Sequence, residues 1–142
     1  MSIYKSLKTN NTLEKKGVTF ELYGNRVTLA RAGGSNTEFQ TSITKKTQPF
    51  RRQIAAGTME AETERRILRE VYADTIILGW EVKVGDEWKS GIESPDGDVL
   101  PYSRANVLAT LEALPELFVE LQNLASSAQP YLEDYEAGTG NS

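Results

Sequence analysis

Carboxylates, hydroxyls and lysines are the only side chains available for chemistry, because the chain has no cysteine and no histidine. Disulfides, thiol nucleophiles, zinc fingers, iron–sulfur clusters and every histidine-based triad or metal site are therefore excluded. An enzyme built from carboxylates, Ser, Lys or Tyr would lack the side chain that titrates most readily near neutral pH. The composition favours a protein that is not an enzyme and that needs neither a metal nor a cofactor.

Three short patterns could hold an ion, and each has a commoner structural explanation. Glu60, Glu62 and Glu64 fit the first turn of a helix, where acidic side chains match the dipole. Asp96-Gly-Asp98 lacks the glycine and closing glutamate of an EF-hand loop. Gly33-Gly34 precedes a helix as in a phosphate cradle, but the spacing matches neither the P-loop nor the dinucleotide fingerprint. A tight connection explains these two glycines better than an anion site.

The elements that must position any site form one domain, since 142 residues is an ordinary size for a single core. We expect residues 1–16 to be a flexible basic arm and residues 131–142 to be an acidic flexible tail. Residues 17–130 are then a single α+β domain. In it, a small N-terminal β-hairpin sheet packs against three to four helices, and the C-terminal half is dominated by helices.

A β-hairpin is predicted from two alternating runs, Val18–Tyr23 and Arg26–Arg31. Gly24-Asn25 between them suits a two-residue type II′ turn, with glycine at the first central position. That turn places four apolar side chains on one face and Glu21 and Thr28 on the other. The predicted pairs are Leu22 opposite Val27 and Phe20 opposite Leu29.

Helices follow the hairpin and supply most of the predicted core. Ser35 to Glu38 fits a capping box that would start a helix carrying Phe39 and Ile43 on one face. The strongest helical pattern runs from Glu60 to about Gly79, and residues 80–100 then alternate as β-strands do. Two further helices are predicted over Arg104–Leu114 and from Pro115 to about Ala128.

Charge is distributed unevenly along the chain. Residues 1–53 carry ten basic and three acidic side chains, a net charge of +7, whereas the remainder carries −11. Such a polar chain favours head-to-tail association of its copies, each positive end meeting the next acidic end. Overall acidity and the lack of interleaved aromatic and basic residues argue against a nucleic-acid partner. The longest mainly apolar stretch, Ala73–Trp80, is far too short to cross a membrane, so we expect a cytosolic protein.

Small dispersed motifs follow one another between about residues 18 and 128. They are Val27-Thr-Leu-Ala-Arg31, Asn36 with Phe39, Arg69-Glu-Val-Tyr-Ala-Asp74, Gly79-Trp80, Asp96-Gly-Asp98, Pro101-Tyr-Ser103, Asn106, Leu114-Pro115 and Leu117-Phe118. Their order and spacing resemble the tail assembly chaperones of long-tailed bacteriophages. Residues 1–16 and those after Tyr131 match nothing in that pattern.

The resemblance implies a non-enzymatic chaperone that works in the host cell cytoplasm. Chaperones of this family coat the long, helical tape measure protein and help to recruit tail tube subunits around it. They leave as the tube polymerises, and relatives are often also made in a longer frameshifted form. The leading alternative is a structural phage neck or tail component that is retained in the virion, and a small carboxylate hydrolase ranks far behind.

A chaperone for an extended helical client needs apolar grooves at helical spacing. The apolar stripe of the C-terminal helices and one tryptophan are the candidate surface, although packing in the core explains the same positions about as well. The candidate partner-binding residues are Trp80, Leu114, Leu117, Phe118, Leu121 and Leu124.

Overall fold

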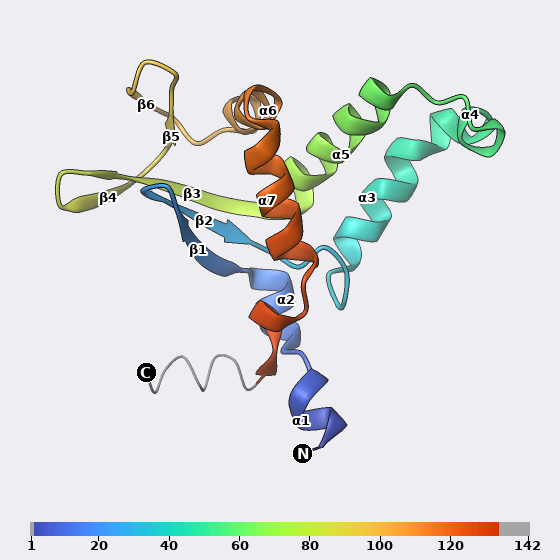
Figure 1. The fold of residues 1–142 in the computed structure, drawn as a ribbon, viewed down its shortest axis with the longest axis horizontal. Helices are drawn as coiled ribbons and strands as arrows, with labels where there is room; N and C mark the ends of the chain where they lie inside the picture. Colours follow the sequence, from blue (N-terminus) through green and yellow to red (C-terminus); the bar gives the residue numbers. More distant parts are fainter. Residues whose placement is uncertain (1, 134–142) are drawn as a thin grey trace.

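A four-stranded antiparallel sheet is the centre of the computed structural model, which describes residues 2–133 (Figure 1). The strand order is β1-β2-β3-β4, so the third strand joins the N-terminal hairpin from the middle of the chain. A separate two-stranded sheet follows the fourth strand. The strands are β1 (Val18–Leu22), β2 (Asn25–Leu29), β3 (Ile77–Val84), β4 (Glu87–Ser90), β5 (Ile92–Glu93) and β6 (Val99–Leu100).

Helices surround this sheet and confirm the predicted α+β class. Figure 1 shows α7 crossing in front of the sheet, while α3 and α5 extend away from it towards α4. The α-helices are α1 (Ile3–Leu7), α2 (Asn11–Lys16), α3 (Thr37–Thr47), α4 (Arg51–Ala56), α5 (Ala61–Thr75), α6 (Arg104–Ala113) and α7 (Pro115–Ser126). Two 3-10 turns are η1 (Gln48–Phe50) and η2 (Gln129–Tyr131).

The core joins one face of the sheet to three helices. The rings of Phe39 of α3 and Tyr72 of α5 pack edge to face, with their centroids 6.0 Å apart. Tyr72 packs in the same way on Phe118 of α7, with a centroid distance of 5.2 Å. Val27 and Leu29 of β2 are fully buried in the same cluster. Edge-to-face ring pairs add to the apolar area that these side chains bury, so they hold the helices on the sheet.

The hairpin has the predicted faces but not the predicted register. Its loop is Tyr23-Gly24, not Gly24-Asn25, and both residues have positive φ (51° and 77°), as a type I′ turn requires. Phe20 consequently pairs with Val27, and Leu22 pairs with Asn25. A shift of two residues leaves every side chain on its original face, which is why the alternation did not reveal it.

The predicted helix from Glu60 to about Gly79 ends earlier, at Thr75. Ile77 begins β3 and pairs with Leu29, and Gly79 pairs with Thr28. The apolar residues at the end of the helical pattern therefore form a central strand. Pairing with β2 makes these residues a strand and not a helix, and local periodicity alone does not reveal that pairing.

The predicted capping box at Ser35 is absent. Helix α3 begins at Thr37 after Asn36, whose side chain makes no capping hydrogen bond. The Asn36 amide instead donates to the backbone oxygens of Arg31 and Thr75, at 2.9 and 3.3 Å. The Ser35 hydroxyl donates to the Glu14 carboxylate at 2.8 Å. Both side chains are therefore used to connect distant segments.

The ends of the described chain are joined to the domain. Residues 11–16, expected in a flexible arm, form α2, whose Glu14 is buried and ion-paired with Arg31. Tyr131, expected at the start of the tail, is fully buried and donates a hydrogen bond of 3.0 Å to the Leu29 oxygen. The exact division into arm, domain and tail stays a prediction, and the rest of the predicted tail, residues 134–142, lies outside the described residues.

Candidate functional site

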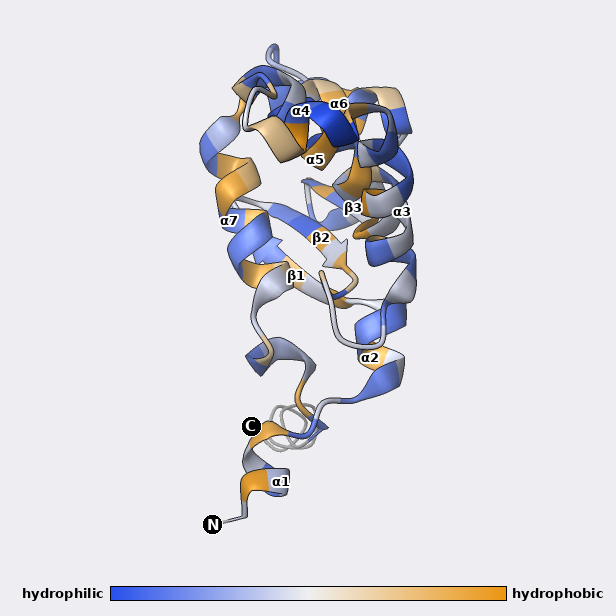
Figure 2. Ribbon diagram, turned by 90° about the vertical axis from the view of Figure 1, so that its right-hand side faces the viewer, coloured by the Kyte–Doolittle hydropathy of each residue, from blue (hydrophilic) through white to orange (hydrophobic). Residues whose placement is uncertain are grey.

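A groove of about 320 Å³ lies between the hairpin end of the sheet and the α6–α7 corner. Its lining comes from five different segments, because the hairpin, β3, β5 and the two helices converge there, and α6 contributes only the polar Thr110. Figure 2 shows hydrophobic and hydrophilic residues alternating along α7, one of the groove's walls. The apolar lining residues are Leu22, Val27, Trp80, Ile92, Leu114 and Leu117.

The polar lining of the groove is acidic. Three carboxylates belong to it, and no basic residue does. We call the whole groove, with its apolar and polar lining residues, the acidic groove. Its remaining lining residues are Tyr23, Asn25, Thr110, Glu93, Glu116 and Glu120.

Two hydrogen bonds fix the hairpin side of the acidic groove. The Trp80 indole N–H donates to Asn25 Oδ1 at 3.2 Å, which sets the plane of the buried ring. The Tyr23 hydroxyl donates to Glu120 Oε1 at 2.8 Å across the opening. This hydrogen bond, with the nearby charge of Glu120, raises the pKa of Tyr23. The turn and α7 are thereby connected on one rim.

Leu114 stands at the corner between α6 and α7 and remains 50% exposed. Its backbone (φ −124°, ψ 75°) is not helical, because the following Pro115 disfavours the helical conformation at this position. Pro115 in turn begins α7 at its first position, as predicted. The sequence thus forces a corner that presents an apolar side chain beside Glu116.

Three of the six predicted partner-binding residues line the acidic groove, namely Trp80, Leu114 and Leu117. Phe118 and Leu121 do not line it, and they are 7% and 0% exposed in the core cluster, to which Trp80 at 4% exposure also belongs. Leu124 is half-buried and packs against the same cluster. The apolar stripe therefore divides into a groove-lining part and a core part, which heptad spacing does not distinguish.

Other groove residues were not among those predicted from the sequence. Tyr23, Asn25 and Ile92 reach the site only because the hairpin and β5 fold over it, and no local pattern marks this. Glu116 and Glu120 did carry a signal, since a spacing of four places them on one helix face. Their place beside Leu117 could have been predicted.

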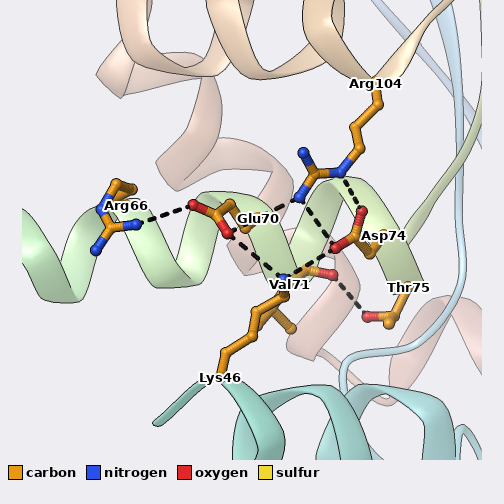
Figure 3. A network of polar contacts seen from close by, with 7 residues as sticks. All are labelled: Lys46, Arg66, Glu70, Val71, Asp74, Thr75 and Arg104. Atoms are coloured by element: carbon orange, nitrogen blue, oxygen red, sulfur yellow. Dashed lines mark hydrogen bonds and ion pairs between the residues drawn. The ribbon is translucent and has the colours of Figure 1, made fainter. Parts of the chain in front are cut away.

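A network of ion pairs joins α3, α5 and α6, as Figure 3 shows. Lys46 of α3 lies 3.4 Å from Glu70 and 3.3 Å from Asp74, both on α5. Arg104 of α6 lies 2.6 Å from Asp74, and its hydrogen bond lowers the pKa of that carboxyl. These four residues and Arg66, which pairs with Glu70, are called the helix network. It fixes the base of α6 and so the direction in which α6 leads to the groove.

The glycine-rich connection before α3 does hold an anion, but the anion belongs to the chain. Glu14 of α2 is 1% exposed, accepts from the Ser35 backbone N–H at 3.2 Å, and pairs with Arg31. Burial opposes ionisation, yet hydrogen bonds from Arg31 and Ser35 outweigh it and lower the pKa of Glu14. A Cβ on Gly34 would collide with this carboxylate. The tight connection predicted there is therefore closed by Glu14.

Neither a metal-binding cluster nor a membrane-spanning helix occurs within residues 2–133. No group of three or more carboxylates in this part of the chain could hold a metal ion, and Glu60, Glu62 and Glu64 stand along the exposed start of α5. Within the same residues, no helix has the length and apolar character that crossing a bilayer requires.

Comparison with known proteins gives one family. The family model described as YdaY prophage protein matches residues 34–140, which include α3 to α7 and most of the acidic groove. No curated protein matches the chain, and no solved structure does.

Proposed function

The chain belongs to the YdaY prophage protein family, and from this phage origin we propose that it is a non-enzymatic tail assembly chaperone. In this proposal it binds the tape measure protein in the host cell cytoplasm and helps to recruit tail tube subunits. The observation that carries the proposal is the acidic groove, in which Leu114 is exposed at the rim, Leu117 is half-buried and Trp80 is a buried lining residue. The order of small motifs across residues 18–128 supports the same role.

The form of the groove suits an amphipathic helix. Leu114 is half-exposed at its rim, and Leu117 lies one turn further along the same wall. An amphipathic helix binds such a surface through apolar side chains spaced three or four residues apart. The carboxylates of Glu93, Glu116 and Glu120 would favour a client helix with basic residues beside its apolar face.

Temporary binding is consistent with the size of the site. A groove of about 320 Å³ admits a few apolar side chains, which is far less than an obligate interface buries. Contacts of this extent allow release when tube subunits compete for the same client. A chaperone needs that property, whereas a permanent structural component does not.

Co-expression with the tape measure protein tests the proposal. The wild-type chain should keep the tape measure protein soluble, and Leu114→Asp should reduce the soluble fraction, because a carboxylate in the rim opposes apolar docking. Val119→Asp is the matched control, since Val119 is 55% exposed on α7 but does not line the groove. An equal effect of the two substitutions, or a tape measure protein that stays insoluble with the wild-type chain, would contradict the proposal.

Mass spectrometry of purified virions distinguishes the alternative role. A chaperone should be absent or present in trace amounts, since it leaves before the tail is complete. Stoichiometric amounts in the particle would instead establish a neck or tail component.

A further inference from the structure

Helix α4 is an exposed element at the far end of the molecule. All six of its residues are exposed, and Ile54 is 47% exposed. Phe50, four residues before Ile54, is half-buried. In Figure 1, α4 lies at the right-hand end of the long axis, whereas the hairpin turn and β5, which border the acidic groove, lie towards the left.

The charges of the two ends are opposite. Arg51 and Arg52 stand in α4, and neither has an ion-pair partner among the residues that the structure describes. From Thr44 to Gly57 the chain has four basic residues and no acidic one. The acidic groove has three carboxylates and no basic residue. The exposed Leu114 of the groove thus lies among carboxylates, and the exposed Ile54 of α4 lies beside Arg51 and Arg52. Glu64 lines the same hollow as Ile54, and Lys46 is paired in the helix network.

We propose that the acidic groove binds helix α4 of a second copy of this chain, joining copies head to tail. Ile54 would contact Leu114 and the apolar wall behind it, while Arg51 and Arg52 would approach Glu116 and Glu120. Complementary charges of this kind set the orientation and increase the rate of association. The inference uses the groove of the proposed function but requires no client.

The geometry of this contact determines what assembles. Because the two surfaces lie at different ends of one molecule, a head-to-tail contact is heterologous and leaves one groove and one α4 unoccupied at the ends of the assembly, whereas a two-fold pair would have to make both contacts at once. The head-to-tail contact gives rings or open chains, and an open chain would have the linear form of an extended client. A six-residue helix in a small groove predicts weak association, with a dissociation constant of about 10 μM to 1 mM.

Sedimentation velocity of the purified chain, without any client, measures this association. The mean mass should rise with concentration from about 10 μM to 1 mM and pass beyond that of a dimer. Raising the ionic strength from about 0.05 to 0.5 M should reduce it, because the charges are exposed and are screened within about 10 Å. A chain that stays monomeric throughout, or stops at a dimer, would overturn the inference.

Charge reversal makes the test specific. Arg51→Glu with Arg52→Glu, and separately Glu116→Lys with Glu120→Lys, should each weaken self-association by more than about tenfold through like-charge contact. A mixture of the two variants should associate again, because the reversed α4 of one fits the reversed groove of the other. The control Lys15→Glu with Lys16→Glu, which makes the same change of net charge on exposed positions of α2, should associate as the wild type does.

Failure of the mixed variants to associate would overturn the inference. The inference would also be overturned if the control variant self-associated as weakly as the α4 variant. If the wild-type chain stays monomeric yet keeps the tape measure protein soluble through Leu114, the groove serves a client and not a second copy. That result would refute the inference and leave the proposed function standing.

Discussion

Glu14 and Glu116 are both glutamates on helices, yet their surroundings are opposite. Glu14 is 1% exposed and has the Arg31 guanidinium, the Ser35 hydroxyl and a backbone N–H as partners. Glu116 is exposed, lines an apolar groove, and has no ion-pair partner within residues 2–133. A buried carboxylate must be satisfied inside the chain, whereas an exposed one beside apolar surface remains available to a partner.

The apolar residues show the same contrast. Leu121 is fully buried and Leu114 is 50% exposed, although both belong to one repeating pattern of leucines. Residues that hold the fold and residues available for binding therefore alternate along α7. Substitutions on the two sides should separate stability from function.

The largest expected effect comes from breaking the buried pair. Arg31→Ala should lower the free energy of unfolding by about 3–5 kcal/mol, because it leaves the Glu14 charge buried without its main partner. Urea denaturation measures the change. Arg65→Ala is the control, since its ion pair with Glu62 is exposed and is worth about 0–1 kcal/mol. Similar losses for the two substitutions would remove the distinction between the buried pair and a surface pair.

The next largest effect on the free energy of unfolding distinguishes two leucines of one stripe. Leu121→Ala should cost about 2–5 kcal/mol through the cavity that it leaves in the core. Leu114→Ala should change stability by less than about 1 kcal/mol, because its side chain is already half in water. Thermal unfolding of the two variants decides between them, and a larger loss at Leu114 would mean that the groove is part of the core.

Acidification should weaken the fold through the paired carboxylates. The pKa values of Glu14 and Asp74 are lowered in the folded chain, so their contribution is fully present above their unfolded values of about 4. It is lost as the pH falls through the folded values, since protonation removes the pairs. Urea midpoints measured from about pH 6 to pH 3 should decrease, and less steeply in Asp74→Asn. An unchanged slope in that variant would argue against the role of the helix network.

The smallest effect on stability is expected in the groove. Glu116→Gln with Glu120→Gln should alter the free energy of unfolding by no more than about 0.5 kcal/mol, since Glu116 is exposed and an amide oxygen at position 120, which is half-buried, can still accept from Tyr23. The same variant should weaken client binding and self-association, because both would lose charge complementarity. A large loss of stability with unchanged binding would reverse the assignment of the two regions.

Local patterns in the sequence predicted the elements better than their partners. Alternation identified the hairpin faces, but a two-residue shift of register at Tyr23 leaves alternation unchanged. Proline at 115 and the serine cap at 103 marked real helix starts, because capping depends on a few neighbouring residues. The predicted end of the helix at about Gly79 was wrong, because the pairing of Ile77 with β2 joins residues far apart in sequence.

The candidate site was predicted only in part, because local patterns do not show which residues far apart in sequence come together. Leu114 and Leu117 were identified because binding and packing both favour large apolar residues at helical spacing, and Trp80 because it is a large apolar residue in a predicted strand. Which members of the stripe are buried depends on how α6 and α7 pack in the core cluster, and those contacts join residues far apart in sequence. The pair Glu14–Arg31 and the burial of Tyr131 join segments that no local pattern connects.

Photocrosslinking tests the central claim most directly. A photoreactive phenylalanine derivative is placed at position 114 or at position 119, and each chain is co-expressed with the tape measure protein. The account predicts crosslinks to the tape measure protein from position 114, inside the acidic groove, and few or none from position 119, outside it. Equal crosslinking from both positions, or none from position 114, would contradict the claim that the acidic groove holds the client.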